Sequence, residues 1–389
     1  MHRLNYLGMY LMIAGIGVTF IFLADIQDEF DLPAWGVGMI ASFSFVASVL
    51  MSIAVSPLAD RGSLLPLAVS GVVAAIVGNV GFALSSSLLG FVLSRSLVGV
   101  GIGLFGVVAR KALIGDDMSN SGERLGAMLS AGVAGFITGP ALGALLADAG
   151  RQLPSILVAI AIAIVAVPWL WWLRSVPLAT EQRVRVRDMR PLLSRPGARA
   201  ALFGQMAVMG NVGVFDSTVD RYLTDLGVSD IAVALALIAI GSPLLFLPTR
   251  VGAFVDRTQP GRLMVLAMAG FAIVVAMMGF WQVLAAFIVI GVCQAVVEST
   301  VMPSAGVLMV RETGAAQSAI GQTLLDSVGQ LLAAATSIVA PIAYAAWGAR
   351  GSFGGSAVMI AVLMLLARRE VSRLDGPTAV RFAAPSSAR

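Results

Sequence analysis

The stretch RSVPLATEQRVRVRDMRPLLSRPGAR occupies residues 174–199 and is the one long hydrophilic segment within the 389-residue chain. It carries seven arginines and two acidic residues. On either side of it the sequence consists of apolar runs separated by short polar gaps. A helix that crosses the hydrocarbon core of a membrane needs about 20 mostly apolar residues. The hydrophilic segment therefore divides the chain into two hydrophobic blocks, each long enough for several membrane helices.

The composition is typical of a membrane protein. Apolar residues make up 58% of the chain and charged residues 12%, with a mean hydropathy of +0.93, against roughly 45–50% and about 25% in soluble domains. The single cysteine, Cys293, excludes an intrachain disulfide and a cysteine-based metal site. The single histidine, His2, stands at the terminus, so a histidine-ligated metal or a Ser-His-Asp triad has no histidine to use. We therefore expect neither an enzyme nor a resident cofactor or metal.

Twelve apolar runs are long enough to cross a membrane. They lie near residues 5–24, 34–56, 65–86, 88–109, 124–146, 154–173, 200–221, 230–251, 263–280, 283–309, 316–340 and 353–367. We interpret the first run as a retained helix because its n-region has only His2 and Arg3 and eleven further runs follow. The sequence predicts an all-α membrane protein with twelve transmembrane helices in two six-helix bundles, residues 1–175 and 200–370. A basic cytoplasmic linker at 176–199 joins them, and a cytoplasmic tail follows at 371–389.

The basic residues indicate the orientation. With both termini inside, 21 of the 25 Lys and Arg residues lie on the cytoplasmic side, where short loops collect them. Arg151, Arg221 and Arg350 fall outside, and Arg95 lies within a span. The basic pI of 9.8 is thereby explained by topology rather than by a nucleic-acid-binding face. We expect a monomeric, multi-pass protein of a bacterial-type cytoplasmic membrane, in contact with the lipid bilayer, with no nucleic-acid partner.

A repeat relates the two blocks. Ala59-Asp60-Arg61, after the second span, recurs as Val255-Asp256-Arg257 after the eighth span, 196 residues later. Secondary transporters are often built from internal repeats, with the substrate site between the halves. The alternative interpretation is that any short loop tends to collect Asp and Arg.

Over essentially its whole length the sequence resembles the major facilitator superfamily. The segment 252–257, GAFVDR, with Gly261 and Arg262 after it, is similar to the family's G-x-L-A-D-R-x-G-R-R loop, whereas the first copy has Ser56 in place of the leading glycine. The resemblance implies two pseudo-symmetric bundles and a cytoplasmic gate in which the aspartate meets a helix N-terminus. The candidate gate residues are Asp60, Arg61, Gly252, Asp256, Arg257, Arg262 and Arg110.

A second pattern lies in the fifth span. Gly126, Gly135, Gly139, Pro140 and Gly143 are similar to the family's G-x8-G-x3-G-P-x2-G motif, with Ala144 where a final glycine is common. The resemblance implies a proton-driven exporter. Physically, glycines four residues apart let two helices approach closely, and a proline bends a helix. Ordinary small-residue packing is the alternative.

The fourth span contains an intramembrane arginine. Arg95, Gly99 and Gly101 resemble the family's R-x3-G-x-G element, whose arginine is implicated in proton coupling. An arginine in hydrocarbon costs roughly 2.5–3.5 kcal/mol on insertion scales, so it should have an acidic partner. Because the first span ends at a similar depth, we expect a pair with Asp25. Snorkelling of Arg95 to the outer interface is the alternative.

Further polar residues lie in the spans of the second half. Ser318, Gln322, Asp326 and Gln330 recur every four residues and so share one stripe of the eleventh span. Gln294 and Glu298 lie on the tenth span, and Asn211 and Asp216 on the seventh. These groups would be costly against lipid and should line a polar cavity or contact another helix. We expect Asp326, Arg95, Asp25, Glu298 and Asp216 to serve proton coupling. For the substrate cavity we expect Gln322, Gln330, Gln294, Asn211 and Ser318.

These observations favour a secondary transporter that exports a lipophilic or drug-like small molecule in exchange for protons, with the proton gradient as its energy source. An exporter of a specific metabolite, sugar or lipid on the same scaffold is the alternative within transport. A non-transporting receptor or scaffold would not require four charged residues inside the membrane.

Overall fold

The computed structural model describes residues 2–59, 64–114, 121–175, 190–255, 257–314 and 318–374. Over these ranges the chain is helical and contains no strand. The helices of the first half are α1 (His2–Phe20), α2 (Leu23–Glu29), α3 (Ala34–Ala59), α4 (Leu64–Leu84), α5 (Leu88–Ile114), α6 (Ser121–Leu145), η1 (Ala147–Ala149) and α7 (Gln152–Leu173). Those of the second half are η2 (Arg190–Ser194), α9 (Pro196–Asp225), α10 (Asp230–Val255), α11 (Pro260–Met278), α12 (Leu284–Thr313) and α13 (Ser318–Leu374).

These helices correspond to the twelve expected spans. The first span is α1 and α2 together, which meet at a bend of 43°. The eleventh and twelfth spans are the two segments of α13, which turns at Gly348 with φ 63° and ψ −157°, a conformation that favours glycine. Helix α9 is the least apolar of the long helices, and four charged residues, Asp216, Asp220, Arg221 and Asp225, lie near its end.

Some predicted boundaries differ from the structure. The seventh span begins at Pro196, where a proline at the first helical position starts a helix well, and η2 precedes it with Leu192 buried. The last ten residues of the expected linker thus pack onto the second half. The last span continues to Leu374. Residues 176–189 and 375–389 lie outside the described residues, and the domain boundaries stay predictions.

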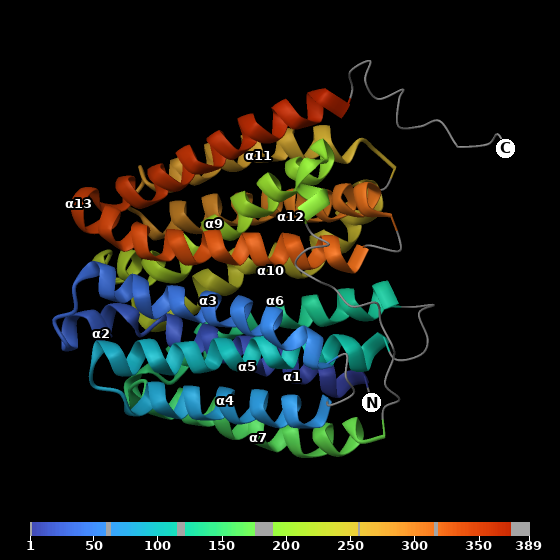
Figure 1. Cartoon of the computed structure of the whole chain (residues 1–389). Helices are drawn as coiled ribbons and strands as arrows, with labels where there is room; N and C mark the ends of the chain where they lie inside the picture. The colour runs from blue at the N-terminus through green and yellow to red at the C-terminus, as the bar shows by residue number, and fades with distance from the viewer. Residues whose placement is uncertain are drawn as a thin grey trace.

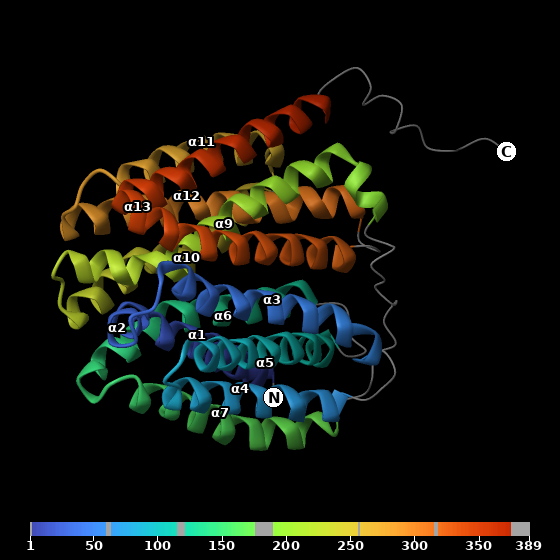
Figure 2. The same cartoon turned by 60° about the vertical axis from the view of Figure 1, so that its left-hand side comes forward.

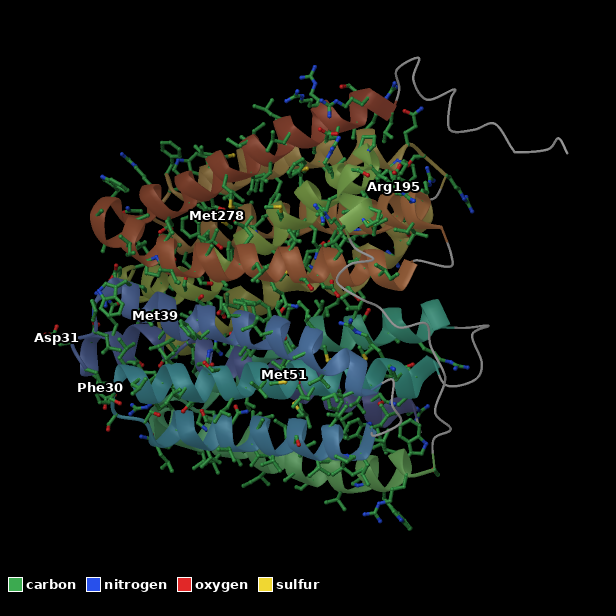
Figure 3. All side chains as sticks on the ribbon, viewed as in Figure 1. Phe30, Asp31, Met39, Met51, Arg195 and Met278 are labelled. Carbon is green, nitrogen blue, oxygen red and sulfur yellow. The ribbon has the colours of Figure 1, made fainter. Side chains whose placement is uncertain are left out.

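The two halves lie side by side (Figures 1 and 2). Helices α1 to α7 form one half and α9 to α13 the other, and His2 and Leu374 lie at the same end of the molecule. We call this the terminal end, and the opposite end the α2 end. Figure 3 shows Phe30 and Asp31 at the α2 end and Arg195 at the terminal end.

Helices α4, α7, α11 and the second segment of α13 form the two outer edges in Figure 1. They expose large apolar side chains, for example Val73 on α4, Ile164 on α7, Leu266 on α11 and Val358 on α13. Such surfaces suit lipid contact, because lipid tails are as apolar as these side chains. The resemblance noted in the sequence implies that spans 3, 6, 9 and 12 form the outer scaffold, and the arrangement in Figure 1 agrees with it.

The interface between the halves is made mainly by α3 against α13 and by α6 against α10. A Cβ atom at Gly38 of α3 would lie 2.5 Å from the carbonyl O of Ser337 on α13. A Cβ atom at Gly241 of α10 would lie 2.6 Å from Cγ1 of Ile137 on α6. The repeat relates α3 to α10, which are the second and eighth spans, and α6 to the first segment of α13. It therefore also relates these two contacts to each other.

The buried apolar side chains divide unequally between the two ends. One cluster is shared by both halves at the α2 end, where Leu23 and Ile26 of α2 pack with residues of α9 such as Val219. The other two clusters each belong to a single half: one contains Met12 and Trp169, the other Leu192 and Met264. Among the described residues, the halves therefore share a hydrophobic core at the α2 end only, and that end is closed.

Candidate functional site

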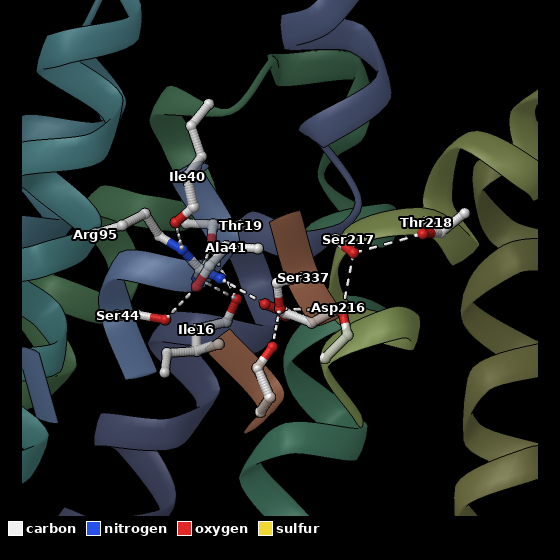
Figure 4. A network of polar contacts seen from close by, with 12 residues as sticks. Ile16, Thr19, Ile40, Ala41, Ser44, Arg95, Asp216, Ser217, Thr218 and Ser337 are labelled. Carbon is white, nitrogen blue, oxygen red and sulfur yellow. Dashed lines mark hydrogen bonds and ion pairs between the residues drawn. The ribbon is translucent and has the colours of Figure 1, made fainter. Parts of the chain in front are cut away.

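Arg95, on α5, is fully buried and joins the two halves. Its Nη2 atom lies 3.2 Å from Oδ2 of Asp216 on α9, and both side chains are 0% exposed. Within the first half, Nη1 donates to the carbonyl O of Ile16 at 3.1 Å and to Oγ1 of Thr19 at 2.5 Å, while Nε donates to the carbonyl O of Ile40 at 3.5 Å (Figure 4). A buried ion pair needs such additional hydrogen bonds to offset its desolvation. Helices α1 and α3 supply them here.

Asp25 is not the partner of Arg95. It is exposed on α2, beyond the 43° bend of the first span. The bend carries Asp25 to the surface of the α2 end, whereas the acid that reaches Arg95 comes from the second half. The predicted Arg95–Asp25 pair is therefore wrong. Snorkelling of Arg95 is wrong as well, since its side chain is inside the protein.

Two more residues of α9 reach the first half close to Asp216. Asp220, one turn further along, is buried, and its Oδ2 accepts a 2.7 Å hydrogen bond from the backbone N–H of Ala24 on α2. Arg221 Nη1 lies 2.5 Å from Oδ1 of Asp28, also on α2. Within six residues, α9 thus makes three polar contacts across the interface, all toward the α2 end.

A cavity of about 540 Å³ lies at the α2 end beside these contacts. It is lined from the first half by Gln27, Asp28 and Ala34 and from the second half by residues that include Arg221 and Tyr344. Neither Arg95 nor Asp216 is among its lining residues. The buried pair therefore does not line this cavity, although Ser217, the neighbour of Asp216, does.

Another ion pair crosses the interface, toward the terminal end. Arg110 Nη2, near the end of α5, lies 3.5 Å from Oδ2 of Asp326 on α13. The two side chains are 40% and 33% exposed, so water reaches this pair. Arg110 was expected in the gate and Asp326 in proton coupling, and the structure brings these two residues together.

The polar stripe of the eleventh span forms as expected on the first segment of α13. Gln322 and Gln330, one turn on either side of Asp326, are half-buried like it. Gln322 Nε2 donates to the carbonyl O of Gly306 on α12 at 3.4 Å. The side chain of Ser318 lies outside the described part of the chain.

Gln294 and Glu298 form a buried polar pair on α12. Gln294 Nε2 donates to Oε2 of Glu298 at 3.4 Å, and the residues are 4% and 8% exposed. Gln294 Oε1 has no hydrogen-bond partner among the described residues. They lie one and two turns from Gly291, which packs against Ile240 of α10. This pair therefore lies on the face of α12 that meets a helix of the interface.

Asn211 lies inside the second half and does not line a cavity between the halves. Its Oδ1 accepts a 2.9 Å hydrogen bond from Oγ of Ser356 on the second segment of α13, and it is 1% exposed. Its expected place in the substrate cavity is therefore corrected. A polar side chain within a membrane helix needs a hydrogen-bond partner, and the second segment of α13 provides it for Asn211.

The gate motif is only partly described. Asp60, Arg61 and Asp256 lie outside the described residues. Gly252 has open space where a Cβ atom would be, and the backbone N–H of Arg257 donates to Phe254 in a turn. Arg262 lies in the first turn of α11, which is cytoplasmic in the predicted topology, and it interacts with another residue.

The glycines of α6 pack against α1 within the first half. A Cβ atom at Gly135 would collide with the carbonyl O of Tyr10, one at Gly139 would lie 2.7 Å from the carbonyl O of Ala14, and one at Gly143 would lie 2.9 Å from that of Val18. Gly126, by contrast, has nothing within 4 Å of that position.

Pro140 of α6 takes part in the same contact. Its Cδ atom would lie 2.8 Å from a Cβ atom placed at Gly17 of α1. The motif's close-approach function thus rests on Gly135, Gly139 and Gly143, and Gly126 does not share it.

The comparisons with known proteins agree with this architecture. The family model described as Major Facilitator Superfamily matches residues 6–247 and again residues 201–386. No curated protein matches the chain in sequence. One similar solved structure is a bacterial homologue of the human lysosomal transporter Spinster, inward-facing and unoccupied, at 15% identity and a TM-score of 0.77, covering 95% of this chain and 96% of that one.

Two other similar structures are transporters as well. The nucleoside transporter NupG has 12% identity and a TM-score of 0.77, covering 95% of this chain and 99% of its own. A D-xylose-proton symporter has 16% identity and a TM-score of 0.74, covering 94% and 96%. At these identities the likeness shows the fold. Because the family model spans nearly the whole chain, this multi-pass membrane protein belongs to the Major Facilitator Superfamily, a family of transporters and not of enzymes.

Proposed function

We propose that the chain is a proton-driven exporter of a lipophilic small molecule that works by alternating access. The observation that carries the proposal is the Arg95–Asp216 ion pair, which is fully buried and joins the two halves at the closed α2 end. Any motion that opens this end must separate the two residues. Separation inside the protein would leave a buried, unpaired charge, which is strongly unfavourable.

A proton can remove this obstacle. Oδ1 of Asp216 is buried and has no hydrogen-bond partner among the described residues, so this oxygen is available to accept a proton. Protonation cancels the charge that attracts Arg95 and lets the halves part at the α2 end. When that end closes again, Arg95 re-forms the pair and displaces the proton. The buried pair would thus couple closure of the α2 end to proton release.

The proton would then leave toward the terminal end. Asp326 faces this end in its partly exposed pair with Arg110, and Glu298 is buried with only an amide beside it among the described residues. Either acid can receive the proton. We propose that Asp326 receives the proton, because its contact with Arg110 crosses the interface. Protonation of Asp326 would weaken this contact and favour opening of the terminal end while the α2 end closes.

The direction of transport rests on the α6 glycine motif and on the topology. The glycine motif resembles the one that marks proton-driven exporters within this family. The described basic residues gather at the loops of the terminal end, as is typical of cytoplasmic loops. We propose a monomer in a cytoplasmic membrane with both termini in the cytoplasm. Half-buried Gln322 and Gln330 would meet the substrate beside Asp326.

The test is transport by the purified protein in proteoliposomes that contain a pH-sensitive dye. The probes are ethidium as a lipophilic cation, glucose as a sugar and a fluorescent phospholipid. We expect ethidium movement to require a pH gradient and to carry protons in the opposite direction. Gradient-dependent transport of glucose or phospholipid alone would support the specific exporter instead.

Two further outcomes would overturn the proposal. Movement of ethidium and protons in the same direction would indicate a symporter, which this fold also supports, as the D-xylose-proton symporter shows. Ethidium transport that does not depend on the pH gradient would indicate facilitated export. Empty liposomes and liposomes with a collapsed gradient serve as controls.

A further inference from the structure

Helix α2 is held by both halves of the protein. On the first-half side, Glu29 pairs with Arg151 at 2.6 Å, and the Arg151 guanidinium carbon lies 5.3 Å from the ring centre of Phe30. On the second-half side, the contacts are those of Asp220 and Arg221 on α9. When the α2 end opens, α2 must lose one of these two attachments.

The contact of Asp220 occurs at the bend of the first span. In a continuous helix the N–H of Ala24 would donate to the carbonyl O of Phe20, four residues earlier. Here α1 ends at Phe20 and α2 begins at Leu23, and the N–H of Ala24 donates to Asp220 instead. Phe22, in the N-cap position of α2, makes no side-chain capping bond. The bend therefore separates this N–H from its helical acceptor, and Asp220 of the second half accepts the hydrogen bond instead.

We propose that Asp220 is a positioning residue of the α2-end gate, whose carboxylate holds the bend between α1 and α2 and thereby ties the shape of the first span to closure of that end. The inference rests on the proposed function, because it requires the α2 end to open during transport. Once the halves part, the N–H of Ala24 returns to Phe20 and the first span straightens.

Asp220 is the stronger of the two attachments to α9. It is 5% exposed, and its hydrogen bond involves a carboxylate, which makes such a bond short and strong. The Arg221–Asp28 pair is 32% and 61% exposed, and exposed pairs add little to stability. Removal of Asp220 should therefore release α2 even with Arg221 in place.

The first experiment measures opening of the α2 end in intact cells. Ser337 is 0% exposed, and its carbonyl O packs against Gly38 of α3, so Ser337→Cys reports on the separation of α3 and α13. The background carries Cys293→Ser, since Cys293 is the only cysteine and is exposed. The readout is the rate of labelling by a membrane-impermeant thiol reagent.

We expect Asp220→Leu to raise the labelling rate about tenfold, because a hydrogen bond to a charged group is lost. Asp220→Asn keeps an amide oxygen near Ala24 and should raise the rate less, and it carries the test if the leucine variant does not fold. Asp225→Asn is the matched control: Asp225 lies on the same helix and bonds to Arg221 and Tyr344 of its own half. Its labelling rate should equal that of the parent.

The second experiment measures the bend. Spin labels at Gln27→Cys on α2 and Ser86→Cys, in the loop between α4 and α5, report a distance within the first half. We expect this distance to change in Asp220→Leu and to stay constant in Asp225→Asn. If Asp220→Leu speeds labelling of Ser337→Cys but leaves this distance unchanged, the assignment is overturned. Asp220 would then keep the α2 end closed without controlling the bend between α1 and α2.

The two levels of the argument fail in different ways. If Asp216→Asn speeds labelling and Asp220→Leu does not, the inference about Asp220 is overturned and the proposed gate stands. If neither variant speeds labelling, the gate itself is wrong and both proposals fall.

Discussion

Two of the ion pairs that cross the interface, Arg95–Asp216 and Arg110–Asp326, differ in their access to water. Arg95 and Asp216 are 0% exposed at the α2 end, whereas Arg110 and Asp326 are 40% and 33% exposed toward the terminal end. Breaking a buried pair by removing one partner costs about 3–5 kcal/mol, while an exposed pair contributes about 0–1 kcal/mol. The same chemistry therefore makes a strong latch at one end and a weak one at the other. A transporter caught with its α2 end closed should show this asymmetry.

The largest expected effect is that of Asp216→Asn. It leaves Arg95 buried without a counter-charge, so the closed state should lose about 3–5 kcal/mol. The accessibility of Ser337→Cys from outside should rise accordingly. Replacing both partners by leucine serves as the control, because a buried pair exchanged for apolar residues is often neutral. A double variant as open as Asp216→Asn would show that the unpaired charge of Arg95 is not what opens the α2 end.

The next effect is that of Gly139→Leu. A side chain at this position meets the backbone of Ala14 and Gly17 on α1, and overpacking of this kind costs about 1–3 kcal/mol. Transport should fall more than thermal stability if the α1–α6 contact moves during the cycle. Gly126→Leu is the matched control, since nothing lies within 4 Å of that Cβ position. Equal loss of transport and stability in Gly139→Leu would show that the motif serves helix packing and not the conformational change.

Asp326→Asn should have a small effect on stability and a large one on transport. Its exposed pair with Arg110 contributes about 0–1 kcal/mol, so the melting temperature should barely change. Proton-driven efflux should be lost while substrate binding persists, as measured by flux and by ligand binding on the same preparation. If Glu298→Gln abolishes coupling and Asp326→Asn does not, the proton carrier lies on α12 instead.

The smallest effect is expected at the loop motifs. Asp60→Asn or Asp256→Asn removes a charge predicted to meet a helix N-terminus, worth about 0.3–1 kcal/mol when exposed and about 2 kcal/mol when partly buried. Spin-label distances across the cytoplasmic mouth should shift toward the state open at the terminal end. Unchanged distances in both variants would leave these motifs as signals of topology only.

Much of the fold could be predicted from hydropathy and charge. The twelve apolar runs became helices because twenty apolar residues in a row have few other stable arrangements in a membrane. The scaffold role of α7, α11 and the second segment of α13 was expected from their scarcity of polar residues. Even α9 was expected, although Asp216, Asp220 and Arg221 lower its hydropathy.

The partners of the polar residues were harder to predict. Burial of Arg95 followed from its place in a span, but its pairing with Asp25 was wrong because sequence gives depth and not the rotation or bending of a helix. The bend at the end of α1 turned Asp25 outward, and Asp216 of α9 meets Arg95 instead. Asn211 was misplaced for the same reason, since its partner Ser356 lies on a distant span.

Asp220 was overlooked despite a usable signal. It follows Asp216 by four residues, so both lie on the same face of α9. Two acids on one face of a membrane helix require two partners, and Arg95 can be only one of them. The other partner is a backbone N–H, which no pattern of side chains reveals.

The most direct measurement of the central claim is proton movement driven by substrate in Arg95→Ala proteoliposomes. Without Arg95, nothing displaces the proton from Asp216 when the α2 end closes. We expect ethidium to move down its own gradient while the internal pH stays constant and an imposed pH gradient drives no uptake. Proton movement at the wild-type ratio in Arg95→Ala would contradict the claim that the buried pair couples the α2 end to protons.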